Sequence, residues 1–324
     1  MSFDRRQFGL AAAGVIAAPA MLRAQTFPSK QVKLIVPFPA GGATDIVGRT
    51  LGEEWGKLWN THVIVENRPG AGSNLGSAQV ARSEPDGHTL LVTAITATIN
   101  PHVYKQVDYN LFTDLTPISL CIQLANLMTV PNSSPAKSVQ EFIAHAKANP
   151  GKLSFASSGT GTSIHLSGEL FKKLTNIEMT HVPYRGSALA ISDLIAGRVD
   201  VMFDNIPFML PQAQGGQVRG LAVTTRERVP SAREYPTVIE SGVPGFDVTS
   251  WFGVTAPAKT PPEIVAKLNA DTVKALNQPS IREKFEKLGA RVTTTTPQEF
   301  GQFMREETAK WGRVVHEAGI KMEG

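Results

Sequence analysis

Short apolar runs alternate with longer helical patterns along almost the whole chain, and this alternation restricts the fold more than any other sequence feature. The run 32–36 reads as a strand, and Val47, Leu51 and Trp55 then recur on one face of a helix predicted over 44–59. Such alternation is typical of parallel sheets with helices on both faces, the α/β class. The other predicted strands are 63–66, 89–93, 153–156, 179–182, 199–203 and 218–223, and the other predicted helices are 138–148, 162–175 and 187–196.

Two apolar runs, 118–130 and 248–256, are longer than the other predicted strands. We interpret each as one long strand that crosses between two doubly wound lobes, and two such crossings form a hinge. The predicted first lobe is then 25–123 plus 252–324, and the second is 124–251. A chain of about 300 residues exceeds what one hydrophobic core usually supports, which also favours two domains. A single large sheet with two ordinary central strands is the alternative.

The first 24 residues have the pattern of a removable export signal. Arg5 and Arg6 precede the apolar run 9–21, which is shorter than the stretch of about 20 residues that spans a bilayer. Small residues follow, so we expect cleavage near Ala24, with 18–20 as a competing site. The paired arginines favour the Tat route, and an ordinary Sec signal is the alternative. Either route predicts a periplasmic mature protein.

Charge and cysteine content restrict the partners of the mature chain. The whole chain has 32 basic and 28 acidic residues, and removing Arg5, Arg6, Arg23 and Asp4 with the signal leaves 29 and 27. These charges are interspersed without a polybasic run, so we expect no nucleic-acid binding. Cys121 is the only cysteine, which excludes an intramolecular disulfide, and its apolar neighbours predict a buried small hydrophobe. No later segment reads as a membrane span, so we expect a soluble protein.

Four glycine-rich loops, each between a predicted strand and a helix start, are the candidate binding elements. They cover 37–45, 69–76, 157–163 and 184–187, two in each predicted lobe. Glycine lets the backbone approach a ligand, and a helix start supplies unpaired N–H groups and the positive end of a dipole. Ordinary helix capping explains any one loop. Four loops at the carboxyl ends of parallel strands predict an anion site, with hydroxyl donors from Thr44, Ser73, Thr160 and Ser163.

Neutral donors are sufficient for such a site. A hydrogen bond to a charged group contributes about 1.5–3 kcal/mol, and micromolar affinity needs about −8 kcal/mol. About four to six such bonds therefore suffice, even after the entropy lost on immobilisation is subtracted. Arg185 is a candidate ligand cation that this site does not require, and a surface cation near a loop is the alternative.

Sequence signatures of enzymes and metal sites are missing. The pair Gly70-x-Gly72 has its next glycine at Gly76, one residue late for a dinucleotide-binding loop, and no Gly-x-Ser-x-Gly nucleophile elbow occurs. The seven histidines are scattered, so we expect no metal site, no cofactor and no catalysis. An exported α/β hydrolase that uses Ser163 near His165 is the competing hypothesis.

Two further polar residues each allow two interpretations. His165, just inside the helix that follows the third loop, either donates to a ligand or packs between helix and sheet. Asp204, directly after the strand 199–203, either receives a ligand ammonium or hydroxyl group or caps the following helix near Pro207.

Several short motifs occur in a fixed order along nearly the whole mature chain. They are Pro37-Phe38-x-x-Gly41-Gly42-x-x-Asp45, Glu66-Asn67-Arg68-x-Gly70-Ala71, Glu84-Pro85-Asp86-Gly87-His88-Thr89-Leu90, Ser157-Ser158-Gly159-x-Gly161-Thr162 with His165, His181-Val182-Pro183-Tyr184-Arg185-Gly186, Pro236-Thr237-x-x-Glu240-x-Gly242, Trp251-Phe252-Gly253 and Ala318-Gly319-Ile320-Lys321. As an ordered set these motifs resemble the Bug family, the TctC-like extracytoplasmic receptors of tripartite tricarboxylate transporters.

The resemblance implies a periplasmic Venus-flytrap fold that is open without ligand and closed around it. It implies that the loops 38–45 and 157–163 hold a carboxylate, partly through ordered water, while 93–98 and 204–208 select the rest of the ligand. Family ligands include tricarboxylates, aliphatic and aromatic dicarboxylates, amino acids and nicotinate. We expect a monomer that delivers its ligand to membrane permease subunits; a receptor that signals to a membrane sensor is the alternative. The predicted ligand-binding residues are Phe38, Gly42, Ala43, Thr44, Asp45, Ser73, Thr93, Ser157, Gly159, Thr160, Gly161, Thr162, His165, Tyr184, Arg185, Gly186 and Asp204.

Overall fold

The computed structural model describes residues 27–317, 319 and 320, so the predicted export signal lies outside the described residues. All the strands and helices predicted above are present, together with elements that were not predicted. No helix in this part of the chain combines the length and the apolar composition of a membrane span. In order, the elements are β1 (Val32–Val36), α1 (Ala43–Trp59), β2 (Val63–Asn67), α2 (Asn74–Ala81), β3 (Thr89–Ala94), α3 (Thr96–Val103), β4 (Leu115–Pro131), α4 (Val139–Ala148), β5 (Leu153–Ser157), α5 (Ser163–Thr175), β6 (Met179–Pro183), α6 (Ser187–Ile195), β7 (Val201–Asn205), α7 (Ile206–Gln214), β8 (Val218–Val223), β9 (Thr249–Pro257), α8 (Pro262–Leu276), α9 (Pro279–Lys287), β10 (Ala290–Val292) and α10 (Pro297–Glu317), with short 3₁₀ turns at Ala71–Ser73 and Pro230–Ala232.

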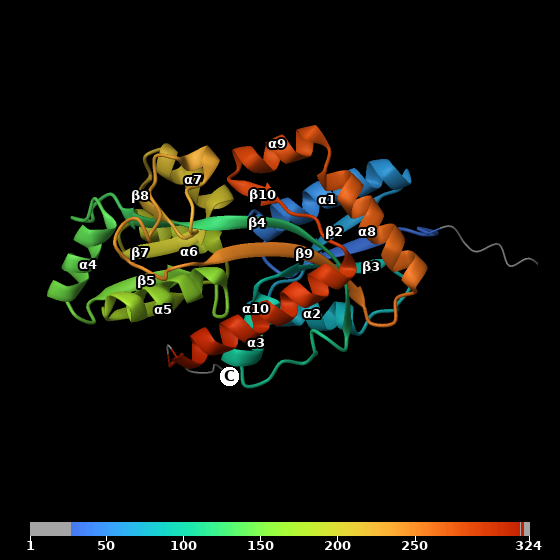
Figure 1. The fold of residues 1–324 in the computed structure, drawn as a ribbon, viewed down its shortest axis with the longest axis horizontal. Coiled ribbons are helices and arrows are strands. Elements are labelled where there is room, and N and C mark those ends of the chain that lie inside the picture. The colour runs from blue at the N-terminus through green and yellow to red at the C-terminus, as the bar shows by residue number, and fades with distance from the viewer. Residues whose placement is uncertain (1–26, 318, 321–324) are drawn as a thin grey trace, which may run out of the picture.

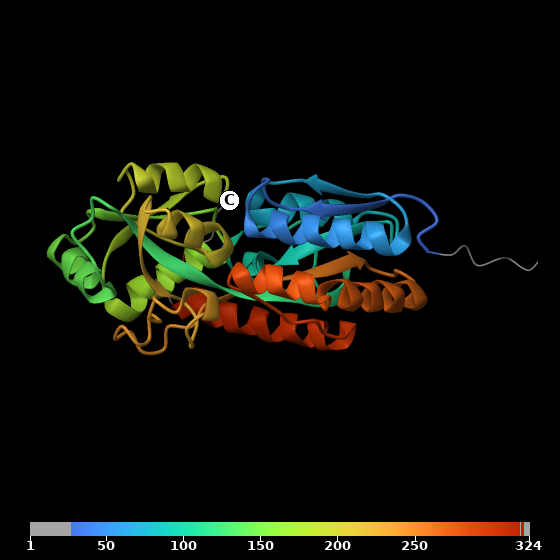
Figure 2. The same ribbon diagram turned by 90° about the horizontal axis from the view of Figure 1, so that it is seen from above.

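The molecule has two halves, with β4 and β9 running between them (Figures 1 and 2). One half contains β1 to β3 with α1 to α3 and the C-terminal helices α8 to α10. The other contains β5 to β8 with α4 to α7. The predicted fold class, two doubly wound α/β lobes joined by two crossing strands, is confirmed. The residue limits of the two lobes stay a prediction.

Strand β4 joins the halves because it has different partners along its length. Its first part, from Leu115 to Ala125, pairs antiparallel with β9, and from Asn126 onward it pairs with β7, where Asn126 lies opposite Asn205. The hydrogen-bonded path is β2-β1-β3-β9-β4-β7-β5-β6, with β8 and β10 paired to β4 beside it. The single-sheet alternative therefore describes the pairing of the strands. Most helices lie over one half or the other, but α10 extends from the first half to the second, where Glu317 pairs with Lys173 of α5 (Figure 2).

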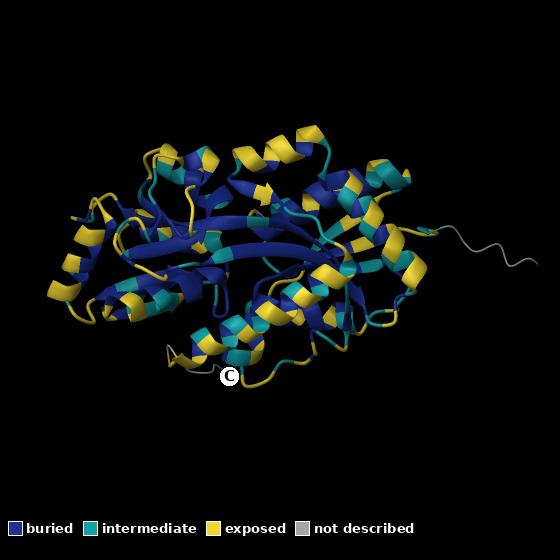
Figure 3. Ribbon diagram, viewed as in Figure 1, coloured by how far each residue is buried: buried dark blue, intermediate teal, exposed yellow. Residues whose placement is uncertain are grey.

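Almost every residue of β4 and β9 is buried, as Figure 3 shows. A strand covered on both faces reads as a nearly continuous apolar run, which explains why both strands were visible in the sequence. Cys121 of β4 is fully buried, and burial raises the pKa of its thiol. The prediction that Cys121 is a buried small hydrophobe is confirmed.

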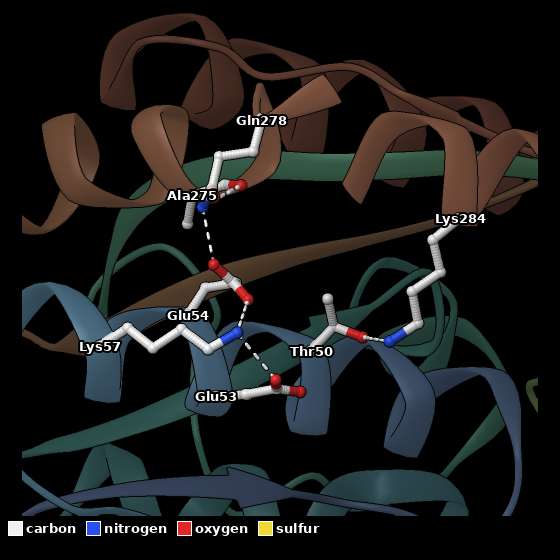
Figure 4. Close-up of polar contacts among 7 residues, drawn as sticks. All are labelled: Thr50, Glu53, Glu54, Lys57, Ala275, Gln278 and Lys284. Atoms are coloured by element: carbon white, nitrogen blue, oxygen red, sulfur yellow. Dashed lines mark hydrogen bonds and ion pairs between the residues drawn. The ribbon is translucent and has the colours of Figure 1, made fainter. Parts of the chain in front are cut away.

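A buried carboxylate on α1 fastens the C-terminal helices to the first half. Glu54 accepts hydrogen bonds from Lys57 Nζ at 2.6 Å and from Gln278 Nε2 at 2.7 Å (Figure 4). Lys284 of α9 bonds the hydroxyl of Thr50 at 3.0 Å on the same face of α1. Glu54 is almost fully buried, so these partners are what compensate its loss of water.

A second buried carboxylate ties α10 to the crossing strand β9. Glu307 Oε2 accepts from the indole N–H of Trp251 at 3.0 Å and of Trp311 at 2.9 Å. Both tryptophan side chains are fully buried. Because Trp251 lies on β9, this contact fixes α10 against the strand that leads from one half into the other.

Candidate functional site

A cavity of 190 Å³, which we call the central cavity, lies between the two halves near the carboxyl ends of the strands. Residues from both halves line it, mostly from loops and helix starts. From the first half they are Phe38, Pro39, Ala40, Gly42, Ala43, Thr44, Ala94, Ile95 and Thr96, and from the crossing strand β9 they are Ser250 and Phe252. From the second half they are Ser158, Thr162, Ser163, Ile164, Arg185, Gly186, Ser187, Ala188, Leu189 and Asn205.

Four helices, α1, α3, α5 and α6, begin at the central cavity. Their first residues are Ala43, Thr96, Ser163 and Ser187, and all four line it. Within the described chain, the residues that precede α1, α3 and α6 make no side-chain capping bond. The first N–H groups of these helices are therefore not occupied by a cap. Such groups, together with the helix dipoles, attract an anion.

The structure brings most of the predicted ligand residues to two adjoining cavities. The second, which we call the side cavity, has a volume of 450 Å³ and shares Phe38, Pro39, Ser158 and Arg185 with the first. The predicted residues in the central cavity are Phe38, Gly42, Ala43, Thr44, Thr162, Arg185 and Gly186; those in the side cavity alone are Ser73, Gly159, Thr160 and Tyr184; Asp45, Thr93, Ser157, Gly161, His165 and Asp204 line neither.

Asp45 braces the first loop from within. Its carboxylate accepts from the Gly41 N–H at 3.0 Å, from Arg49 Nε at 2.8 Å and from Asn67 Nδ2 at 2.9 Å. Burial alone raises the pKa of Asp45, but the bonds from Arg49, Gly41 and Asn67 outweigh burial and hold that pKa below its ordinary value. The ionised side chain therefore orients the loop and does not face the cavity.

Ser157 and His165 support the third loop in a similar way. The Ser157 hydroxyl lies 2.7 Å from His181 Nε2, and His165 Nδ1 accepts from the Gly161 N–H at 3.3 Å. The two imidazole rings stack with centroids 4.1 Å apart. Burial lowers the pKa of His165 to about 3 and that of His181 to about 4, so both rings are neutral at neutral pH. His165 thus packs between helix and sheet, the second of its two interpretations.

Ser163 and His165 have separate partners. The Ser163 hydroxyl donates to Ser250 Oγ at 3.3 Å and accepts from Asn205 Nδ2 at 3.5 Å, whereas Nδ1 of His165 is taken by Gly161. A serine nucleophile needs a base within hydrogen-bond reach. Among the described residues, Nδ1 of His165 is bonded to the Gly161 N–H and not to the Ser163 hydroxyl, so it does not serve as that base.

Thr93 and Asp204 lie behind the cavity lining. Thr93 Oγ1 is 2.6 Å from Thr255 Oγ1, a contact between β3 and β9. Asp204 Oδ1 accepts from the Asn205 N–H at 2.6 Å, before α7 begins, and no described side chain makes a capping bond at the start of that helix, so this contact supports neither interpretation of Asp204. Burial raises the pKa of Asp204 to about 6, and hydrogen bonds from Ser187 and Asn205 offset only part of this effect.

Loops from the two halves touch around these cavities, and glycines make the approach possible. A Cβ atom on Gly72 would lie 2.8 Å from the carbonyl oxygen of Thr160, to which the Tyr104 hydroxyl donates at 3.4 Å. A Cβ atom on Gly186 would lie 3.2 Å from Cγ of Pro39. Both glycines also have positive φ, a conformation that side chains disfavour.

Thr96 and Asn205 line the cavity but were predicted only as members of the ligand-selecting segments 93–98 and 204–208, and Ser250 was not predicted at all. Asn205 follows a predicted strand and precedes Pro207, a pattern that could have identified it as a helix start. Thr96 begins a helix whose preceding residue, Ile95, carries no capping side chain, so no local signal marks it. Ser250 is placed at the cavity by strand pairing, which the sequence does not reveal.

The central cavity combines neutral donors with an apolar wall. Arg185 is the single charged residue among the described residues that line it, and that side chain is exposed. Phe38, Ile95, Ile164 and Phe252 supply apolar surface. In the described ranges, no cluster of three or more His, Cys, Asp or Glu side chains is placed to hold a metal ion. The arrangement suits a small organic anion.

Comparison with known proteins agrees with this geometry. The profile of the tripartite tricarboxylate transporter family receptor matches residues 47–320. The chain belongs to that family. Its Bug-like motifs, noted above as a resemblance, are accounted for by this membership.

Three solved structures are similar over nearly their whole length. Rpa4515 of R. palustris, solved with adipate, has a TM-score of 0.89 and 36% identity and covers 92% of this chain and 100% of its own. The periplasmic binding protein BugD has a TM-score of 0.87 and 33% identity, with 92% and 100% covered. MatC of Rhodopseudomonas palustris, with bound malate, has a TM-score of 0.84 and 34% identity, with 89% and 100% covered.

Proposed function

We propose that this receptor captures a small carboxylate in the central cavity by closing its two lobes and delivers it to a tripartite tricarboxylate transporter. The observation that carries the proposal is the convergence of four helix starts on one small cavity between the halves. A carboxylate there accepts hydrogen bonds from the first N–H groups of α1, α3 and α6, which no described side chain caps, and from those at the start of α5 that the Thr162 cap leaves unoccupied. Adipate with Rpa4515 and malate with MatC support the same class of ligand.

The volume of the central cavity favours a small metabolite. Pockets for drug-sized ligands usually enclose about 300–1,000 Å³, whereas this cavity has 190 Å³. The carboxylate lies against the starts of α1 and α5, and the apolar wall takes the rest of the ligand. The residues proposed to contact it are Phe38, Gly42, Ala43, Thr44, Thr162 and Gly186.

Closure occurs by rotation about β4 and β9. The moving bodies are the predicted lobes, 25–123 plus 252–324 and 124–251. A ligand that contacts both bodies favours the closed state by its differential affinity for that state. Because donors from both halves line the central cavity, the closed state offers a carboxylate more hydrogen bonds than either lobe alone.

The receptor acts in the periplasm, as a monomer, and passes its ligand to the membrane permease subunits. The export-signal pattern of residues 1–24 and the similarity to the periplasmic protein BugD support this location. We infer binding without catalysis, because the family is a receptor family and because Ser163 and His165 engage different partners.

A panel of mono-, di- and tricarboxylates that includes adipate and malate tests the proposal by thermal shift. A ligand at about 100 times its Kd stabilises the folded state by about 2.7 kcal/mol. We expect a selective shift, and recovery of the bound ligand chemically unchanged. If no carboxylate raises the melting temperature, the proposed function is wrong; if the ligand is converted to product, the hydrolase hypothesis replaces it.

A further inference from the structure

The polar floor of the central cavity is a chain of hydrogen bonds between neutral side chains. Asn205, Ser163 and Ser250 line the cavity, and the fully buried Asn126 and Ser167 lie behind them. Strand pairing places Asn126 of β4 opposite Asn205 of β7. Ser163 and Ser167 lie one turn apart on α5.

One backbone carbonyl sets the direction of this chain. The Ser167 hydroxyl donates to the carbonyl oxygen of Ser163 at 2.8 Å, and a carbonyl oxygen can only accept. Ser167 Oγ is therefore the acceptor for Asn126 Nδ2 at 3.1 Å. Asn126 then turns its Oδ1 toward Asn205, which must present Nδ2 to it at 2.5 Å. The network thus fixes the amide orientation of both asparagines.

This orientation leaves the oxygen of the Asn205 amide for the ligand. Its Nδ2 group is directed to Asn126 and, at 3.5 Å, to Ser163. Among the described residues, no other group bonds to Oδ1 of Asn205, which belongs to the cavity lining. The cavity floor therefore offers a hydrogen-bond acceptor at this point. A carboxylate oxygen is also an acceptor and cannot pair with it.

The neighbouring Ser250 offers a donor. Ser163 Oγ accepts from Asn205 Nδ2 and donates its own proton to Ser250 Oγ at 3.3 Å. The proton of Ser250 is then available to the ligand. One acceptor beside one donor matches a ligand that carries a carboxylate and, separately, a hydrogen-bond donor.

We propose that Asn205 selects carboxylates that also carry a hydroxyl or ammonium group over the same carbon skeletons without one. Asn126 and Ser167 are positioning residues, because neither lines the cavity and both act through Asn205. The selection rests on the proposed function, since it concerns the ligand of the same cavity. Hydroxy acids and amino acids are the ligand classes that fit, because both combine the carboxylate with a donor.

Matched ligand sets test the selection by titration calorimetry on the mature protein. The sets are succinate, malate and aspartate; glutarate, 2-hydroxyglutarate and glutamate; and propionate, lactate and alanine. Within the skeletons that bind, we expect a donor-bearing member to bind at least about tenfold more tightly, because the unsubstituted acid leaves the buried amide oxygen unpaired. Equal or tighter binding of the unsubstituted acids overturns this inference alone. Binding of no carboxylate at all overturns the proposed function, and the inference with it.

The variant Ser167→Ala tests the positioning without touching the cavity. Removing the hydroxyl lets the amides of Asn126 and Asn205 turn over, so that Asn205 can donate to the ligand. We expect the unsubstituted acid to bind more tightly than it does to the wild type, which damage to the fold does not produce. Thr175→Val is the matched control, because Thr175 of α5 makes the same kind of bond to the carbonyl of Phe171, at 2.6 Å, away from the cavity.

A folded Ser167→Ala protein with the wild-type preference overturns the positioning role. Asn205→Leu removes the acceptor directly, and we expect it to lose the preference for donor-bearing ligands while Thr175→Val keeps it. If a thermal melt shows that Asn205→Leu does not fold, the result for Ser167→Ala alone decides whether Asn205 selects the ligand. A retained preference in folded Asn205→Leu refutes selection by Asn205.

Discussion

Replacing Ala43 by proline removes one N–H group from the central cavity with little effect on the fold. Ala43 is the first residue of α1, where proline fits because the N–H has no partner inside the helix. Gly42 before it has extended backbone, with φ −84° and ψ 174°, which a following proline tolerates. Three helices whose first residues lie outside this cavity already begin with proline, at Pro262, Pro279 and Pro297.

The expected effect follows from the strength of one charge-assisted hydrogen bond. An N–H donor to a carboxylate contributes about 1.5–3 kcal/mol, and each 1.4 kcal/mol changes Kd by about tenfold. Ala43→Pro should therefore raise the Kd for the ligand by about 10- to 150-fold. The free energy of unfolding should change by less than about 1 kcal/mol, because the substitution suits the native backbone.

Titration calorimetry measures the affinity, with the tightest ligand from the carboxylate panel, and urea denaturation measures the stability. Ala43→Val is the control, since it adds comparable bulk and keeps the N–H group. Wild-type affinity in a folded Ala43→Pro protein would refute the view that the start of α1 holds the carboxylate. Equal losses in both variants would assign the effect to bulk instead.

Three further predictions concern stability and the first loop. Glu307→Ala should lower the free energy of unfolding by about 2–6 kcal/mol, because it leaves the buried indole N–H groups of Trp251 and Trp311 without an acceptor. Glu307→Gln keeps an acceptor and should lower the free energy of unfolding by less than half as much. Equal losses for the two variants in urea denaturation would contradict this. The folded-state pKa of His165, about 3, lies below the unfolded value of about 6.5. The unfolded chain therefore binds the proton first, so the contribution of His165 to stability is complete above pH 6.5 and falls by about 2 kcal/mol at pH 5. Denaturation at pH 7 and pH 5 should show a smaller difference for His165→Gln than for the wild type. Gly42→Val should weaken ligand binding without lowering the melting temperature, since a Cβ atom there meets no atom within 4 Å and φ is −84°; a lowered melting temperature would indicate a structural role.

The sequence alone determined the positions of the strands and of the helices that follow the binding loops. Val32–Val36 and Leu153–Ser157 are apolar runs bounded by turn residues, and the loops after them contain the glycines and hydroxyls that start α1 and α5. These signals are local, because burial of one face imposes a periodicity that can be read within a single segment. The ordered motifs, which extend over nearly the whole chain, also indicated the family to which the protein belongs.

Only the tertiary structure decided which polar side chains reach the cavity. Asp45, Ser157 and His165 stand in the predicted loops and helix starts, yet they turn inward and support the loops. Asn205 and Ser250 lie far apart in sequence and meet at the cavity because β7 and β9 both pair with β4. Whether a residue at the end of a strand faces a cavity or the core depends on strand register and helix packing. Both are set by contacts between distant segments, which no local pattern records.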